Sequence, residues 1–167
     1  MKKNLVYPLG ALILGMSLSF QSCDKEDDID LLSAPEFVQK TFSSMYPDVN
    51  YAEWEQEKAT KKYKADFHYF GTHSEWGVDF NNVEANAWFM SDGAWEKTEF
   101  DVTAFYRNSA DTFIPAAVRT KVAELAGGRE IDLDAVDTPS TDYFLLEVDY
   151  EPNDKYYKIG FDGRQID

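Results

Sequence analysis

The sequence predicts an α+β fold made of two tandem repeats, each a helix packed on an antiparallel sheet of about four strands. Two amphipathic segments of helical period begin at Pro35 and Pro115. Each is followed by segments in which apolar and polar residues alternate, the pattern of half-buried strands. Each series of such segments includes an Asp-Gly pair, Asp92-Gly93 in the first and Asp162-Gly163 in the second. The same order of elements therefore occurs twice along the chain.

Residues 1–22 have the pattern of a removable export signal. Lys2 and Lys3 are followed by a mostly apolar stretch from Leu5 to Phe20 and then by small residues. The apolar stretch is shorter than the ~20 residues that span a bilayer. We therefore interpret it as a signal peptide and not as a membrane anchor.

Cys23, the only cysteine of the 167 residues, follows this signal directly, so no disulfide can form within the chain. The run Phe20-Gln21-Ser22-Cys23 resembles a bacterial lipobox, which implies cleavage before Cys23 and attachment of lipid to its sulfur and amino groups. The acidic residues 23–32 are expected to form a tether. They also resemble signals that bring lipoproteins to the cell surface. We expect a lipid-anchored protein of the cell envelope, in the outer membrane, with periplasmic and surface-facing orientations both open.

The first repeat is predicted over residues 33–104. Ser33 and Glu36 are expected to cap a helix that runs to about Tyr46. Alternation from Tyr63 to Tyr69 and from Trp76 to Phe80 predicts two strands. Asn81-Asn82 is a second candidate for a tight hairpin, because asparagine tolerates positive φ.

A connector is predicted over residues 105–114 and the second repeat over 115–167. Its helix places Arg119 toward water and ends at Gly127-Gly128. Alternation then predicts strands from Phe144 to Tyr150 and from Tyr157 to Phe161. Because each repeat alone is shorter than ~80 residues, we expect the two sheets to pack together or join.

This arrangement resembles the β-lactamase-inhibitor-like, PepSY-like family of small secreted or lipid-anchored bacterial proteins. The resemblance covers most of residues 33–167 and depends on a series of mainly aromatic and turn positions: Pro35, Val38, Phe42, Tyr46-Pro47, Trp54-Glu55, Tyr63, Phe67, Trp88-Phe89, Asp92-Gly93, Trp95, Thr98-Glu99, Ile114-Pro115 and Val118. It implies tandem repeats of a helix and an antiparallel sheet. The first repeat is longer than the second by about 11 residues, around Gly71 to Asn82.

Charge and motifs exclude several functions. Loss of Lys2 and Lys3 with the signal leaves 14 basic and 31 acidic residues, a net charge of −17, which opposes binding to nucleic acid. The chain after residue 22 has no Gly-x-Ser-x-Gly, Ser-x-x-Lys or phosphate-binding glycine loop. We therefore predict that the protein is not an enzyme and needs no cofactor. A pair of glycosidase carboxylates is left open, because so many acidic residues always include some suitable pair.

Two groups of residues have side chains that bind metals, and neither has a complete ligand set. His68 and His73 are five residues apart with no third ligand nearby, and zinc needs three or four. The run Asp132-x-Asp134-x-x-Asp137 lacks the glycine and closing glutamate of an EF-hand loop. We expect no metal site at either place.

A sheet with helices on one face leaves its other face open. We expect the open face to bind a protein or peptide, because rigid aromatic side chains with a polar rim are typical of interfaces. The predicted contact residues are Asp66, His68, Phe70, Glu147, Tyr156 and Lys158, with Phe89 as a further exposed aromatic residue. The resemblance adds that the partner is a candidate hydrolase. The alternative is an enzyme or ligand carrier of the envelope in which Trp76 or Trp88 stacks on a sugar.

Overall fold

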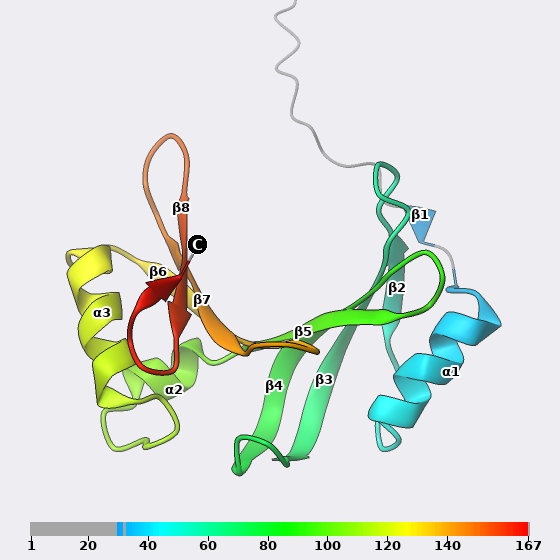
Figure 1. The fold of residues 1–167 in the computed structure, drawn as a ribbon, viewed down its shortest axis with the longest axis horizontal. Helices are drawn as coiled ribbons and strands as arrows, with labels where there is room; N and C mark the ends of the chain where they lie inside the picture. Colours follow the sequence, from blue (N-terminus) through cyan, green and yellow to red (C-terminus); the bar gives the residue numbers. More distant parts are fainter. Residues whose placement is uncertain (1–29, 32, 167) are drawn as a thin grey trace, which may run out of the picture.

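The computed structural model describes residues 30–31 and 33–166, which form one antiparallel sheet with three helices (Figure 1). The nine strands are hydrogen-bonded in chain order, from β1 at one edge to β9 at the other. The helices are α1 (Glu36–Met45), α2 (Thr103–Arg107) and α3 (Ala116–Ala126). The strands are β1 (Asp30–Leu31), β2 (Glu53–Gln56), β3 (Tyr63–His73), β4 (Val78–Phe89), β5 (Trp95–Asp101), β6 (Ile131–Asp137), β7 (Tyr143–Val148), β8 (Lys155–Gly160) and β9 (Gln165–Ile166).

The predicted α+β class is confirmed, and the two expected sheets join into one. Strands β5 and β6 pair from Thr98 opposite Asp137 to Asp101 opposite Asp134. Each of the longer helices is followed by four strands, α1 by β2 to β5 and α3 by β6 to β9. The predicted signal, the lipidation at Cys23 and nearly all of the acidic tether lie outside the described residues.

Helix α1 buries Val38 and Phe42, as its apolar period predicts. The prediction that Ser33 caps this helix is wrong, because the N-cap residue is Pro35 and no side chain caps the helix. The carbonyl of Pro35 accepts bonds from the backbone amides of Val38 and Gln39 and so fixes the first turn.

Helix α3 ends at Gly127, whose φ of 57° is the left-handed conformation expected there. Arg119 does not point to water as predicted. Its guanidinium donates hydrogen bonds of 2.6 to 3.2 Å to the carbonyl oxygens of five residues: Phe105, Tyr106, Asn108, Asp111 and Ile114. Arg119 therefore holds the connector, which includes the last residues of α2, against α3.

The β3–β4 hairpin contains the extra residues of the first half. Asn81-Asn82 does not form its turn, so that prediction is wrong: Asn82, with a φ of 64°, is a bulge where the pairing shifts between Tyr69 and Phe70. The turn lies earlier in the chain, at residues 74–77, and ends at Gly77, whose φ is 61°. Asp92-Gly93 and Asp162-Gly163 do lie in hairpin turns, as predicted, with φ of 88° and 79° at the glycines.

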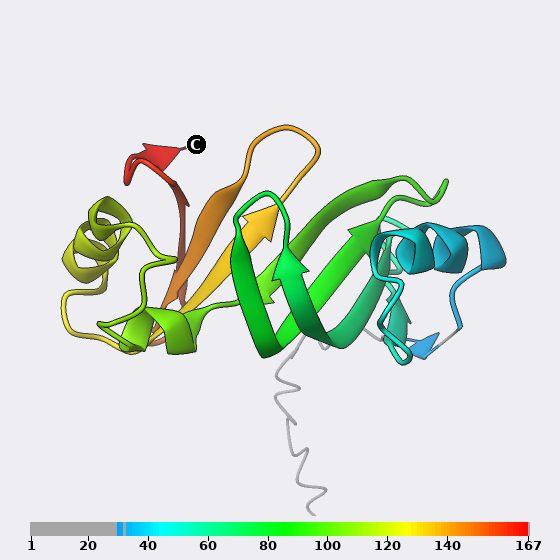
Figure 2. The same ribbon diagram turned by 90° about the horizontal axis from the view of Figure 1, so that it is seen from below.

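The end of this hairpin lies between α1 and α3 on the helix side of the sheet (Figure 2). His73 Nε2 is 3.2 Å from Asp137 Oδ2, and Trp76 Nε1 donates to Asp142 Oδ2 at 2.8 Å. The rings of His73 and Trp76 are stacked at 3.9 Å. The extra residues therefore connect the two halves of the chain.

The core lies between the sheet and these three covering elements. Phe42 of α1 packs against Phe67 and Phe89, and Phe80 of the hairpin stacks on Phe100 at 5.3 Å. Helices α1 and α3 lie outside the curve of the sheet, so the uncovered face is concave (Figure 1). Among the described residues, no helix is long and apolar enough to cross a membrane.

Candidate functional site

The strand register determines which side chains reach the concave face. Residues directly opposite each other on neighbouring strands share a face of a sheet. Ala65, Ala87 and Thr98 are successive partners, and all three are fully buried on the helix side. Their neighbours along the strands, Asp66, Asn86 and Glu99, therefore lie on the concave face, where Val136 and Tyr143 continue the row.

Two hollows lie on this face. The first, of about 360 Å³, is lined by Asp66 and His68 together with Tyr51, Glu53 and Glu84. Burial raises the pKa of the Asp66 carboxyl, although Lys64 beside it acts in the opposite direction. His68 is exposed at the surface of this hollow.

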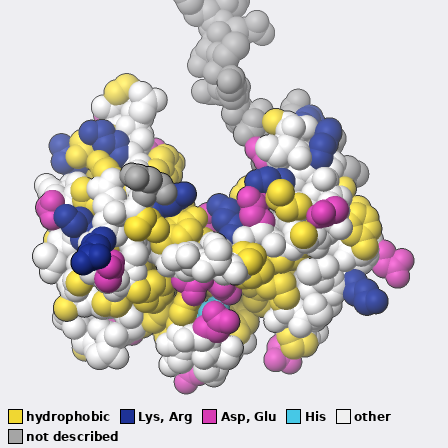
Figure 3. Space-filling view, viewed as in Figure 1, with side chains coloured by type: hydrophobic (Ala, Val, Ile, Leu, Met, Phe, Trp, Pro, Cys, Tyr) yellow, Lys and Arg dark blue, Asp and Glu magenta, His cyan; other side chains and the backbone are white. Residues whose placement is uncertain are grey.

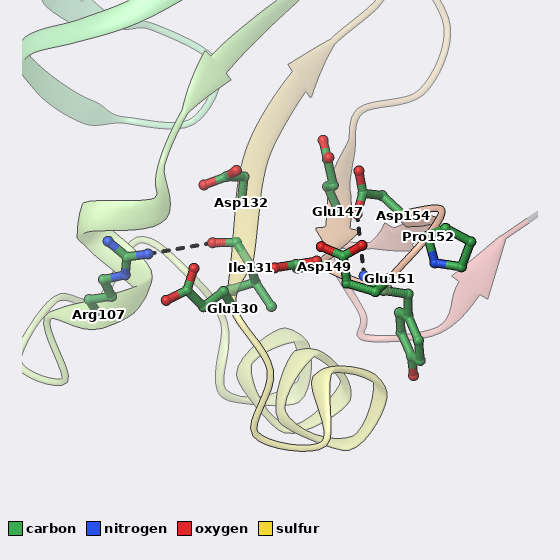
Figure 4. Close-up of a pocket in the computed structure, with 10 residues that line it drawn as sticks. Arg107, Glu130, Ile131, Asp132, Glu147, Asp149, Glu151, Pro152 and Asp154 are labelled. Atoms are coloured by element: carbon green, nitrogen blue, oxygen red, sulfur yellow. Dashed lines mark hydrogen bonds between the residues drawn. The ribbon is translucent and has the colours of Figure 1, made fainter. Parts of the chain in front are cut away.

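The second hollow, also about 360 Å³, lies at the other end of the face (Figure 4). Its lining includes six acidic residues: Glu130, Asp132, Glu147, Asp149, Glu151 and Asp154. Arg107 is the one cationic residue in that lining, and its Nη2 donates to the Ile131 carbonyl at 3.5 Å. Burial, with Asp154 and Asp132 nearby, raises the pKa of Glu147.

The structure places the predicted contact residues in two groups. Asp66 and His68 share the first hollow. Glu147 lines the second and pairs across the strands with Tyr156, which is 60% exposed. Lys158 lies near by, with its ammonium 5.4 Å from the centre of the Tyr143 ring.

Two further aromatic residues behave differently from each other. Phe70 is 58% exposed on β3, beside the bulge that Asn82 makes in β4. The expectation that Phe89 is exposed is wrong, because its side chain is fully buried between Phe42 and Trp54 on the helix side.

A sequence model of the family described as "Putative beta-lactamase-inhibitor-like, PepSY-like" matches residues 21–73 and again residues 74–162. The chain belongs to this PepSY-like family. The family resemblance predicted from the aromatic and turn positions is therefore confirmed. No curated protein matches the chain.

Solved structures of three Bacteroides proteins share the PepSY-like fold seen here. A DUF2874 family protein from Bacteroides ovatus is 20% identical, with a TM-score of 0.62 over 81% of this chain and 86% of its own. A protein from Bacteroides eggerthii described as periplasmic is 22% identical, with a TM-score of 0.60 over 81% and 88%. A BLIP-like protein from Bacteroides fragilis is 20% identical, with a TM-score of 0.59 over 81% and 85%.

The histidines and the acidic run considered as metal ligands each divide between the two faces of the sheet. His68 lies on the concave face, whereas His73 lies on the helix side and contacts Asp137. Asp132 and Asp134 lie on the concave face, and Asp137, at an odd spacing from both, lies on the other.

Glu75, Asp137 and Asp142 are a group that the sequence did not indicate, with carboxylate oxygens within 4.8 Å of one another. Asp142 accepts bonds from Trp76 Nε1 and from the Thr138 amide. Two of these three carboxylates therefore hold the hairpin of this PepSY-like chain in place.

The contact residues predicted from the sequence do not include the central residues of the concave face. Trp88 donates to Glu99 at 3.0 Å and lies between the ammonium groups of Lys64 and Lys97. Asp134 is half-buried, and burial together with Glu99, Asp101, Asp132 and Glu147 raises its pKa to about 7. The alternation of Ile131 to Asp137 could have placed Asp134 on a strand, but not which acidic residues face it.

Proposed function

We propose that this protein is a non-enzymatic binding module, anchored by lipid at the cell envelope, that recognises a protein partner on its concave face. The observation that carries the proposal is the sheet itself: α1, α3 and the β3–β4 hairpin all cover one face and leave the other open (Figures 1 and 2). A broad concave surface with half-buried aromatic and charged side chains is typical of a protein interface.

The space-filling view supports a large partner. The two ends of the molecule rise on either side of a hollow between them, in which hydrophobic and charged side chains are both exposed (Figure 3). The contact residues proposed are Asp66, His68, Phe70, Glu147, Tyr156 and Lys158. Because these residues lie in two groups at opposite parts of the face, a partner that contacts both groups must present an extended surface. The BLIP-like description of a structural neighbour favours a hydrolase as that partner.

The tandem organisation is part of the proposal. Residues 33–104 and 115–167 would each be a repeat of one helix and its following strands, joined by residues 105–114. The recurrence of one helix and four strands in each half supports this division. Joining the two sheets gives a binding face longer than either repeat could supply.

A photo-crosslinking experiment in intact cells tests the binding proposal. A photoreactive amino acid replaces His68 in one variant and Tyr156 in another, and Glu124 on the outer side of α3 in the matched control. We expect both concave-face variants to form an adduct with the same protein, and the control to form none. Adducts that are identical at all three positions, or absent at both concave-face positions, would contradict the proposal.

The lipid anchor has a separate test, because it depends on Cys23 alone. Cys23→Ala should abolish labelling by a fatty-acid analogue and release the protein from washed membranes, since stable anchoring needs two or more acyl chains. Cys23→Ala protein that stays in the membrane fraction would refute the lipoprotein assignment. Removal of residues 24–30 should leave acylation unchanged and, if they direct surface display, make the protein resistant to protease added to intact cells.

A further inference from the structure

The two halves of the concave face differ in how their charges are paired. In the first half, Lys64 lies 3.0 Å from Glu55 and 3.1 Å from Asp66, and Lys97 lies 2.6 Å from Glu99. Three acidic side chains of the first half, Glu55, Asp66 and Glu99, are therefore each paired with a lysine of the same face.

The second half, together with the end of β5 that pairs with it, brings like charges together. The register places Asp101 opposite Asp134 and Asp132 opposite Glu147. Within the part of the chain that the structure describes, none of these four carboxylates forms an ion pair. Like charges directly opposite each other destabilise a sheet by roughly 0.2–1 kcal/mol per pair. The first half has a like-charge pair of its own, Glu53 opposite Asp66, but Lys64 lies 3.1 Å from that aspartate. The two pairs of the second half have no such lysine within the described residues.

Desolvation increases that cost. Asp134 lies among the other acidic residues on a sheet face, where burial and its neighbours favour the protonated form. The acidic hollow of Figure 4 includes Asp132, the next residue along β6 on the same face, and Glu147 of β7. Its one cationic residue, Arg107, donates to the Ile131 carbonyl and, among the described residues, forms no ion pair with these carboxylates.

We propose that the second half of the concave face, centred on Asp134 and Glu147, binds an extended polypeptide segment of the partner that carries lysine or arginine at alternate positions. This inference rests on the proposed function and adds the chemistry of the partner. Successive side chains on one face of a strand are about 6.6 Å apart. Asp132 and Asp134 have this spacing on β6, so an extended segment lying along the strand would place a cation near each.

The arrangement fits a polypeptide better than a single metal ion. A calcium ion needs six to eight oxygen ligands at about 2.3–2.6 Å, which requires carboxylates that converge on one point. Among the described residues, the one group of three metal-binding side chains with ligand atoms within 4.8 Å of one another is Glu75, Asp137 and Asp142. The carboxylates of the second half are instead spread over three strands. Tyr156, exposed beside Glu147, offers a ring for the aliphatic part of a lysine or the plane of an arginine.

The test uses the full chain and a defined peptide. The probe is an eight-residue peptide of alternating arginine and threonine with blocked ends, and its reference is the same peptide with citrulline in place of arginine. We expect the arginine peptide to bind with an affinity that falls as salt rises, and Asp134→Asn with Glu147→Gln to weaken it by roughly tenfold or more. The matched control, Glu36→Gln with Glu124→Gln, removes two carboxylates from the helix side and should change the affinity less than about twofold.

Three outcomes would overturn the inference. The two double variants could lose affinity equally, which would show a non-specific effect of net charge. The citrulline peptide could bind as well as the arginine peptide. Calcium chloride without peptide could bind at Asp134 and Glu147 while the peptide does not.

The photo-crosslinking variants separate this inference from the proposed function. An adduct at Tyr156 that forms in cells and is unchanged by Asp134→Asn with Glu147→Gln would preserve the protein interface and refute the cationic segment. Peptide binding that depends on Asp134 and Glu147, without any concave-face adduct in cells, would support the charge chemistry and refute the proposed function.

Discussion

Replacing Asp134 with asparagine should stabilise the protein at alkaline pH and have little effect at acidic pH. The pKa of this carboxyl is raised from 3.8 to about 7, chiefly by burial and then by the acidic residues around it. Between these two values the folded protein holds a proton that the unfolded chain has lost. The free energy of unfolding therefore falls as pH rises through this window, and the loss is complete above about pH 7 to 8.

The size of the effect follows from the shift in pKa. A difference of about 3 pKa units corresponds to at most about 4 kcal/mol over the whole window, since each unit is 1.36 kcal/mol. About 3 kcal/mol of this should fall between about pH 5 and about pH 8.5. Asparagine has nearly the shape of the protonated acid and cannot ionise. The stability of the Asp134→Asn variant should therefore lack this part of the pH dependence.

The assay is urea unfolding followed by tryptophan fluorescence at about pH 5 and about pH 8.5. The quantity of interest is the difference in unfolding free energy between wild type and variant at each pH, because the contributions of the other titrating groups are common to both proteins and cancel. Glu124→Gln is the matched control: it removes an acidic charge paired with Lys121 on exposed α3 and should shift stability by less than about 0.5 kcal/mol. Equal pH dependence in the wild type and in Asp134→Asn would refute the reasoning.

Three further predictions concern contacts between segments that are distant along the chain. Arg119→Lys should lower the free energy of unfolding by about 2–4 kcal/mol, because an ammonium group cannot reach all five carbonyl oxygens. Arg164→Lys, at an exposed ion pair, is the control and should change the free energy of unfolding by under about 0.5 kcal/mol in the same urea titration. In thermal unfolding, Gly163→Ala should destabilise the protein by about 1–3 kcal/mol more than Gly77→Ala. Both glycines have positive φ, but a Cβ at Gly163 would lie 2.7 Å from the backbone of α3, whereas a Cβ at Gly77 would meet nothing within 4 Å. Trp76→Phe should lower the free energy of unfolding by about 1–3 kcal/mol, because Asp142 loses its 2.8 Å hydrogen bond from the indole. Hydrogen exchange should show faster opening of the β3–β4 hairpin in this variant. Unchanged exchange in the hairpin would contradict the role of Trp76 in joining the halves.

Local patterns in the sequence determined the type and order of most elements. The helical period placed Val38, Phe42, Val118 and Val122 on the buried faces of α1 and α3, because one face of a short helix must pack on a core. Asp92-Gly93 and Asp162-Gly163 predicted hairpin turns, because those turns need positive φ. Val38, Phe42, Val118 and Asp92-Gly93 are also among the positions that carried the family resemblance. The alternation of apolar and polar residues also placed Asp66, His68 and Glu147 on the polar faces of their strands.

Only the tertiary structure decided how these elements combine into one surface. The pairing of β5 with β6 joins strands separated by α2, the connector and α3, and no local pattern specifies such a register. That register is what places Asp101 opposite Asp134 and gives the second half of the concave face its uncompensated charge. The bulge at Asn82, the burial of Phe89 and the five carbonyl contacts of Arg119 likewise depend on packing between distant segments. A sequence shows which residues alternate along each strand, but which acidic residues face one another depends on contacts formed only when the chain has folded.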